Sequence, residues 1–140
     1  MRIMAIDYGD AHTGIAISDP TGFLAGFTTT IDAYRPEVVV QRITELARQH
    51  GAEELVLGHP KNMDGTLGPR AEKAEAMAEL LKEATGLPVI LWDERRTTIE
   101  AHSILSASGK KMKQHKKNVD AVAATLILEG YLARKRMDNR

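Results

Sequence analysis

The 140-residue sequence contains no cysteine, so disulfide bonds and cysteine-based zinc sites are excluded. No apolar run reaches membrane-spanning length, and no cationic segment followed by an apolar run stands at the start. Aromatic residues make up only 4%, which argues against bases stacking on an aromatic sheet. We therefore expect a soluble, cytoplasmic protein, with a single domain over residues 1–140 that is long enough to bury one sizeable core.

The net charge of the chain is zero, but its charged residues are unevenly distributed. Residues 110–140 contain nine basic and three acidic residues, a net charge of +6, whereas the other 109 residues contain ten basic and sixteen acidic residues, a net charge of −6. Such asymmetry is typical of a protein with a polyanionic partner. A basic surface that is merely solvated is the other interpretation.

The periodicity of apolar residues predicts a mixed α/β fold. Strands are expected at 1–7, 13–18, 23–31, 54–58 and 89–92, the first and last of them buried, and helices at 36–50, from Pro69 to about 85, 98–108 and 119–136. A long loop is expected at 59–69, and a basic linker at 109–117 with Asn118 capping the last helix. Strands joined by crossover helices imply a mixed sheet with helices on both faces.

Four acidic residues stand at informative places in this pattern. Asp7 ends the first strand, Asp93 and Glu94 end the last, and Asp120 falls in the first turn of the last helix. If the two strands run parallel, their ends share one sheet edge, where ligands of α/β proteins usually bind. Converging carboxylates repel each other unless a hard divalent cation such as Mg²⁺ lies between them.

Each acid also has a structural interpretation. Asp7 would begin a turn, Asp93 and Glu94 would pair with the following arginines, and the helix dipole alone would favour Asp120. Gly9 and Gly14 either leave room for a phosphate beside Asp7 or allow tight strand pairing. The cations at this edge would hold phosphates without reading bases; they are Lys61, Arg70, Arg95, Arg96, Lys113, Lys116 and Lys117.

Four motifs resemble the YqgF family, whose members are named as candidate pre-16S rRNA nucleases or Holliday junction resolvases. They are DYGDAHTGIAISDP (7–20), HPKNMDGTLGPRA (59–71), LWDERRTT (91–98) and NVDAVAATLILEGYL (118–132). The resemblance implies a ribonuclease H-like fold, with a five-stranded mixed sheet in which strand two is antiparallel. It also implies cleavage of phosphodiesters with Mg²⁺ or Mn²⁺.

Carried over to this sequence, the resemblance makes Asp7 the first metal ligand, Asp93 or Glu94 the second and Asp120 the third, with Asp7, Glu94 and Asp120 as the catalytic residues. Resolvases of this fold carry an acid at the end of strand four, where this chain has His59.

The expected activity is that of an endonuclease or exonuclease in 5′-end processing of pre-16S rRNA. Resolution of four-way DNA junctions, which would favour a homodimer, is one alternative, and a non-catalytic module that binds RNA or the ribosome is another.

Overall fold

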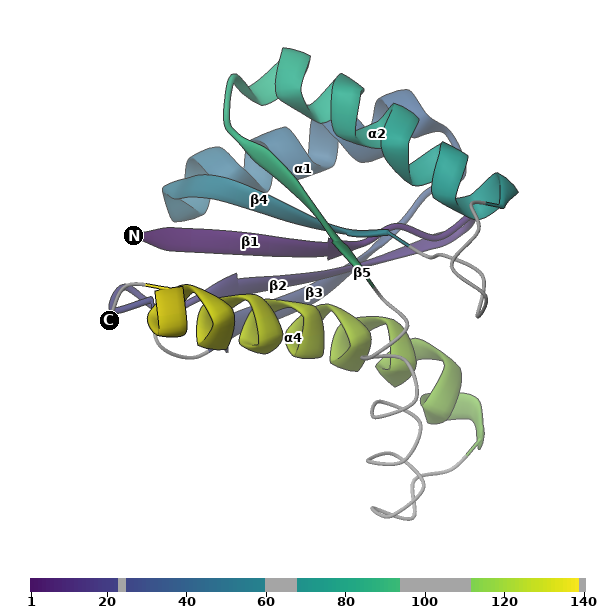
Figure 1. Ribbon diagram of the computed structural model, residues 1–140. Helices are drawn as coiled ribbons and strands as arrows, with labels where there is room; N and C mark the ends of the chain where they lie inside the picture. The colour runs from purple at the N-terminus through teal and green to yellow at the C-terminus, as the bar shows by residue number, and fades with distance from the viewer. Residues whose placement is uncertain (23–24, 60–67, 94–111, 139–140) are drawn as a thin grey trace.

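The computed structural model describes residues 1–22, 25–59, 68–93 and 112–138, and in the last range the side chains of 122–137. In chain order the elements are β1 (Arg2–Asp7), β2 (His12–Ser18), β3 (Ala25–Asp32), α1 (Pro36–His50), β4 (Ala52–His59), α2 (Pro69–Thr85), β5 (Val89–Asp93) and α4 (Met112–Asp138) (Figure 1). The strands, α1 and α2 lie where the sequence predicted them. The predicted helix at 98–108 and most of the predicted loop lie outside the described residues.

The five strands form one mixed sheet in the order β3-β2-β1-β4-β5. β2 is antiparallel to β1 and to β3, whereas β1, β4 and β5 run parallel. This confirms the five-stranded mixed sheet with an antiparallel second strand. Because β1, β4 and β5 are parallel, their carboxyl ends lie at the same edge of the sheet.

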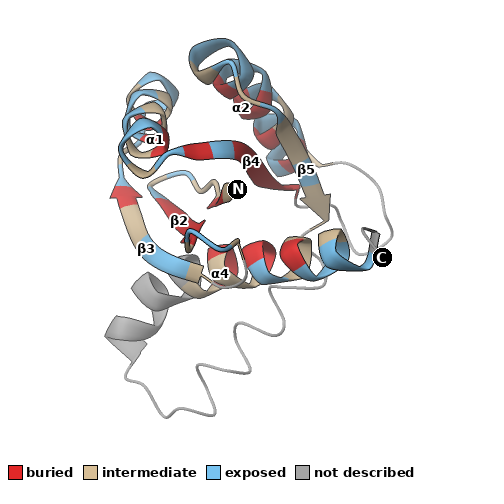
Figure 2. Cartoon of the chain, turned by 90° about the vertical axis from the view of Figure 1, so that its left-hand side faces the viewer, coloured by how far each residue is buried: buried red, intermediate tan, exposed pale blue. Residues whose placement is uncertain are grey.

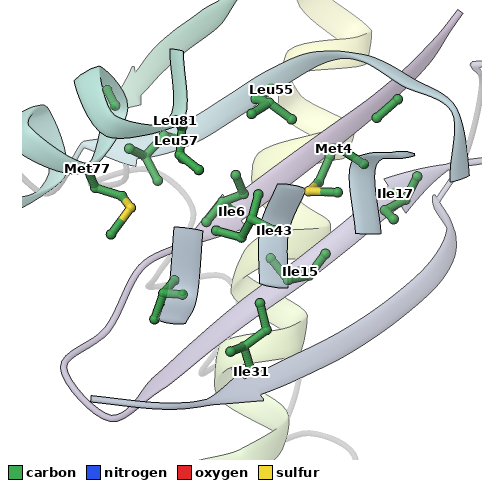
Figure 3. Packing of buried hydrophobic residues seen from close by; sticks show 14 of the residues in the cluster. Met4, Ile6, Ile15, Ile17, Ile31, Ile43, Leu55, Leu57, Met77 and Leu81 are labelled. Carbon is green, nitrogen blue, oxygen red and sulfur yellow. The ribbon is translucent and has the colours of Figure 1, made fainter. Parts of the chain in front are cut away.

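Helices cover both faces of the sheet, with α1 and α2 on one side and α4 on the other (Figure 1). The larger core lies under α1 and α2 and includes Met4, Ile6 and Leu57 from the sheet (Figure 3). The smaller core lies under α4 and includes Ile3, Ala5 and Val56. Buried residues accordingly occupy the strands and the inward sides of the helices (Figure 2).

Proline stands at the start, and glycine just after the end, of α1 and of α2, as the sequence predicted. Pro36 and Pro69 stand in the first turns of α1 and α2, where the missing N–H is not needed. Gly51 and Gly86 follow the two helices with φ of 67° and 70°, the left-handed conformation that glycine adopts without a steric penalty.

Two predictions of burial are wrong. β5 was expected to be a buried strand, yet Leu91 is 39% exposed and its neighbours are only partly buried. The reason is its position, because β5 is an edge strand with a neighbour on one side only. The apolar residues of α2 predict a buried stripe of Ala74, Met77, Ala78, Leu81 and Ala84, and all but Ala84, which is exposed in the last turn, are buried.

The start of the last helix is also corrected. α4 begins at Met112, so residues 112–117 are helical and not a linker, and Asn118 lies inside the helix and does not cap it. The helix runs antiparallel to β1, because its distal end reaches the amino end of the sheet. There Tyr131 donates a short hydrogen bond to Glu54, and the Lys135 Nζ lies 3.3 Å from a Glu54 carboxylate oxygen. No helix in the described part of the chain is long and apolar enough to span a membrane.

Candidate active site at the carboxyl edge of the sheet

Three side chains with polar chemistry end the parallel strands. Asp7 ends β1, His59 ends β4 and Asp93 ends β5. The register pairs His59 with Asp93 and Ile6 with Leu57, so all three residues lie at the same edge. The prediction that the acids of the first and last strands share an edge is therefore confirmed.

The two aspartates nevertheless belong to opposite faces of the sheet. Side chains alternate along a strand, and Ile3 and Ala5 pack against α4, so Asp7 follows them onto the α4 face. On β5, Trp92 packs in the same α4-side core, which places Asp93 on the face of α1 and α2 together with His59. Sharing an edge is thus not enough for Asp7 and Asp93 to hold one ion.

Asp7 is partly buried, and none of the described side chains forms a hydrogen bond or an ion pair with its carboxylate. Neighbouring acids differ in this respect. Asp10 accepts a hydrogen bond from Lys73 at 3.2 Å, and Asp32 lies 2.7 Å from His12 Nδ1. A partly buried carboxylate without a protein cation beside it is the kind of donor that suits a hard divalent ion.

Asp120 lies in α4, on the same side of the sheet as Asp7. It is eight residues after Met112 and therefore in the third turn of the helix, not in the first as predicted. The helix dipole consequently does not account for an acid at this position, because its effect is confined to the first turn. The side chain of Asp120 is outside the described part of the chain, as is all of Glu94.

His59 ends β4, the place where the family resemblance implies an acid in resolvases of this fold. It is 8% exposed, and its Nε2 lies 3.1 Å from an Oε1 of Glu75 on α2. Sequence reasoning missed Glu75. A signal was available, because Glu75 is four residues after Ala71 and three before Ala78, both buried, which puts it beside the core-facing stripe of its helix.

Of the predicted cations, the structure describes Arg70 in full. It is exposed in the first turn of α2, which begins at the carboxyl edge (Figure 1). Lys113, Lys116 and Lys117 lie in the first turns of α4, where only the backbone is described. Lys61, Arg95 and Arg96 fall outside the described residues.

Gly9 has a structural role in the turn. A Cβ on Gly9 would come within 2.3 Å of the His12 carbonyl oxygen, so the bare backbone lets the turn between β1 and β2 close. In that turn, Tyr8 packs against the larger core. Burial first, and then the carboxylate of Asp10, raises the pKa of the Tyr8 hydroxyl.

Within the described residues, no three His, Asp or Glu side chains are grouped so that they could hold a metal ion. Asp7 supplies the only predicted ligand on the α4 face whose side chain is described. Its hard oxygen donors and its lack of a cationic partner there fit Mg²⁺ or Mn²⁺.

Comparison with known proteins agrees with this fold. A sequence model of a family described as RuvX, Holliday junction resolvase, matches residues 1–134. The chain belongs to the RuvX family. This confirms the resemblance to the YqgF group that the four motifs carry.

Relatives within the family are similar over nearly their whole length. A protein from Pelotomaculum thermopropionicum is 46% identical over 133 residues, 94% of this chain and 86% of that protein. One from Halothermothrix orenii is 44% identical over 132 residues, 94% of each chain. Both are named as candidate pre-16S rRNA nucleases.

Two solved structures with a similar fold are those of nucleases. Thermus thermophilus RuvC, in complex with a Holliday junction substrate, has a TM-score of 0.65 with 16% identity, covering 97% of this chain and 96% of that chain. The large terminase nuclease from phage G20c has a TM-score of 0.58 with 12% identity, covering 94% and 81%. At these identities the likeness shows the fold alone, which is ribonuclease H-like as expected.

Proposed function

We propose that this RuvX-family chain is a metal-dependent nuclease that hydrolyses phosphodiester bonds in 5′-end processing of pre-16S rRNA, in the cytoplasm. The observation that carries the proposal is the environment of Asp7. Its carboxylate is partly buried at the carboxyl edge, on the face that α4 covers, without a described side chain to neutralise it. The names of the curated relatives support rRNA as the substrate.

Asp7, Glu94 and Asp120 are the proposed catalytic residues and ligands of Mg²⁺ or Mn²⁺. The alternation of β5 puts Asp93 on the face opposite to Asp7, which favours Glu94 of the two candidates. Asp120 is four residues before Ala124, and Ala124 is buried against the sheet, so helical spacing supports a place for Asp120 on the same stripe. A bound ion would supply a more acidic water and would stabilise charge on the leaving oxygen.

The chain's own residues have separate roles in this proposal. Packing of β1 against α4 through the smaller core would hold Asp7 and Asp120 in position. Lys61, Arg70, Arg95, Arg96, Lys113, Lys116 and Lys117 are proposed to bind the phosphates of the nucleic acid. Contacts of this kind position the strand without reading its sequence, and binding should weaken steeply as salt is added.

A second candidate function is cleavage of four-way DNA junctions. It is favoured by the description of the family as Holliday junction resolvase and by the fold shared with RuvC. Because a junction has two strands to cut, this activity would call for a homodimer. A module that binds RNA or the ribosome without cleaving is the remaining alternative.

The deciding experiment is a cleavage assay of wild type and Asp7→Asn in Mg²⁺ and in Mn²⁺. Precursor 16S rRNA and a four-way DNA junction are offered side by side, and binding is measured in parallel without divalent ions. Wild type should shorten the precursor at its 5′ end. Asp7→Asn should lose cleavage by about 100-fold or more while it keeps its affinity, because the cations and not Asp7 bind the phosphates.

Asp32→Asn is the matched control. Asp32 is an exposed carboxylate at the same sheet edge, but it is paired with His12, and its replacement should leave cleavage unchanged. Equal cleavage by wild type and Asp7→Asn would refute the metal site. Cleavage of the junction alone would establish the resolvase, and binding without cleavage in either ion would establish the non-catalytic module.

A further inference from the structure

A hollow opens on the other side of the same edge, between the start of α1 and the part of α2 from Lys73 to Leu80. Its volume is about 410 Å³, within the range of roughly 300–1,000 Å³ that is usual for small-ligand sites. Both helices begin at the end of the sheet where β1 stops (Figure 1). The walls are formed by Tyr8, Tyr34, Pro36 and Met77, and Asp10 and Lys73 stand at its polar side.

Two of the chain's few aromatic side chains line this hollow. Tyr34 lies between β3 and α1 and is 79% exposed, the highest exposure among the large apolar side chains of the described residues. Tyr8 is partly buried and forms part of the inner wall. Tyr8 also follows Asp7 directly in the chain, so their Cα atoms are about 3.8 Å apart. Because Tyr8 packs against the larger core, its ring lies on the face of α1 and α2, across the edge of the sheet from the Asp7 carboxylate.

The charges around the hollow suit one nucleotide better than a duplex. Lys73 lies on its wall, and Arg70, three residues earlier, is exposed on the same side of α2. The start of α1, at Pro36, adds the positive end of one helix dipole. Asp10 and Glu37 are acidic neighbours of Tyr8, and they oppose a closely packed run of phosphates but not a neutral base.

We propose that this hollow binds one unpaired nucleotide of a strand that crosses the carboxyl edge from the scissile phosphate at Asp7, with its base stacked on Tyr34 against the wall formed by Tyr8. Arg70 binds the phosphate that flanks it, together with Lys73, whose exposed ion pair with Asp10 would then be shared with the phosphate. The inference rests on the proposed nuclease function, which supplies the scissile phosphate at Asp7. It makes the substrate class a single-stranded or locally unpaired segment, since a base inside a duplex cannot reach an aromatic platform without being extruded.

The experiment uses the full chain without divalent ions, so that binding is separated from cleavage. The probes are a single-stranded RNA 12-mer with one 2-aminopurine, whose fluorescence falls on stacking, and the blunt duplex of the same sequence. Wild type should bind the single strand more tightly and quench its fluorescence. Tyr34→Ala should bind it about tenfold more weakly and lose the quenching, the usual effect of removing one stacking partner.

Two variants serve as controls. Tyr34→Phe keeps the ring and should behave as wild type. Phe27→Ala removes another exposed aromatic ring, at the opposite end of the sheet beside His50, and should have no effect.

Lys73→Met should weaken binding of the single strand but leave the quenching of the bound probe intact.

Unchanged binding and quenching in Tyr34→Ala would overturn the subsite, as would equal affinity of wild type for duplex and single strand. Loss of self-association in Tyr34→Ala, measured by light scattering, would assign the hollow to a second copy of the chain and overturn it as well. The two proposals can fail separately. Quenching without cleavage in Mg²⁺ or Mn²⁺ refutes the nuclease and keeps the subsite, whereas cleavage that Tyr34→Ala does not alter refutes the subsite and keeps the nuclease.

Discussion

At the scale of single residues, the pairing of each acid separates the candidates for catalysis from the structural ones. Asp10, Asp32 and Asp7 all stand near the same edge, and the first two have a lysine or histidine within hydrogen-bond distance. Asp7 has no such partner among the described side chains. This difference supports Asp7 as the proposed metal ligand, and it depends on neighbours that the position of Asp7 in the sequence does not reveal.

A substitution pair tests which acid after β5 belongs to the site. Glu94→Gln should lower the rate of cleavage by about 100-fold or more, because removing a metal ligand costs at least as much as disturbing the groups around it. Asp93→Asn should lower it far less, because β5 alternates and Asp93 lies on the face opposite to Asp7. Single-turnover rates in Mn²⁺ give the comparison.

Metal binding by the same two variants supplies an independent readout. Calorimetric titration with Mn²⁺ should show weaker binding in Glu94→Gln and wild-type affinity in Asp93→Asn. The reverse order in both measurements would mean that Asp93 is the ligand and that the strand does not keep its alternation to its end.

Gly9 shows why one position can carry two interpretations. The sequence places a bare backbone beside Asp7, which suggested room for a phosphate. The structure uses that room for the His12 carbonyl, only three residues away, where a Cβ would be 2.3 Å from the oxygen. A contact across a tight turn depends on backbone dihedrals that composition does not encode, so pattern alone could not distinguish the two uses.

At the scale of elements, α4 is the part of the fold that sequence reasoning placed least well. The lysines and glutamine of residues 112–117 were interpreted as a linker, although both residue types favour helices. Asn118 precedes an apolar run and was therefore interpreted as a helix cap, although the residues before it have a high helix propensity. Ala124, Ile127 and Leu128 of this helix are fully buried against the sheet.

The distal end of α4 is anchored by a polar contact that has a measurable pH dependence. Tyr131 donates to Glu54, which is 9% exposed. Burial, followed by the hydrogen bond to Glu54, raises the pKa of the Tyr131 hydroxyl well above its usual 10.0. Tyr131→Phe should lower the free energy of unfolding by about 1–3 kcal/mol near neutral pH, because a buried carboxylate loses a donor.

The sign of the pH effect follows from linkage. The folded chain holds the tyrosine proton more tightly than the unfolded chain, so this stability is fully present below about pH 10 and is lost as the pH rises above it. The difference between wild type and Tyr131→Phe should therefore be constant up to about pH 9 and should shrink beyond it. Urea unfolding across that range measures it, with Tyr34→Phe as the control whose difference should stay near zero. A difference that does not change with pH would contradict the assignment.

At the scale of the whole molecule, the order of strands and helices along the chain was predictable. The face of the sheet on which each strand-end residue lies was not. The spacing of apolar residues, and the proline and glycine at helix ends, locate β1, α1 and α2 well. These signals, such as Pro36 and Gly51, act locally. Which face receives a strand-end residue depends on register between strands distant in sequence. The exposure of β5 likewise depends on its place at the edge, which local patterns do not contain.

Charge separation along the chain gives the last prediction. The net charge is +6 over residues 110–140 and −6 over the rest, so a nucleic acid should be held mainly through the first turns of α4. Each phosphate contact on a single strand contributes about 0.7 to the slope of log K against log salt concentration. Replacing Lys113, Lys116 and Lys117 together with glutamine should thus reduce the slope by about 2 and weaken binding at low salt, whatever the base sequence.

The matched control changes the overall charge by the same amount elsewhere. Arg42, Arg48 and Lys82 are exposed on α1 and α2, and Arg48 and Lys82 lie in the last turns, away from the carboxyl edge. Their joint replacement with glutamine should leave the slope nearly unchanged, because charges farther than the Debye length of about 10 Å at 0.1 M salt are screened from the bound strand. Equal slopes for the two triple variants would show that net charge, and not a localised basic surface on α4, governs the binding.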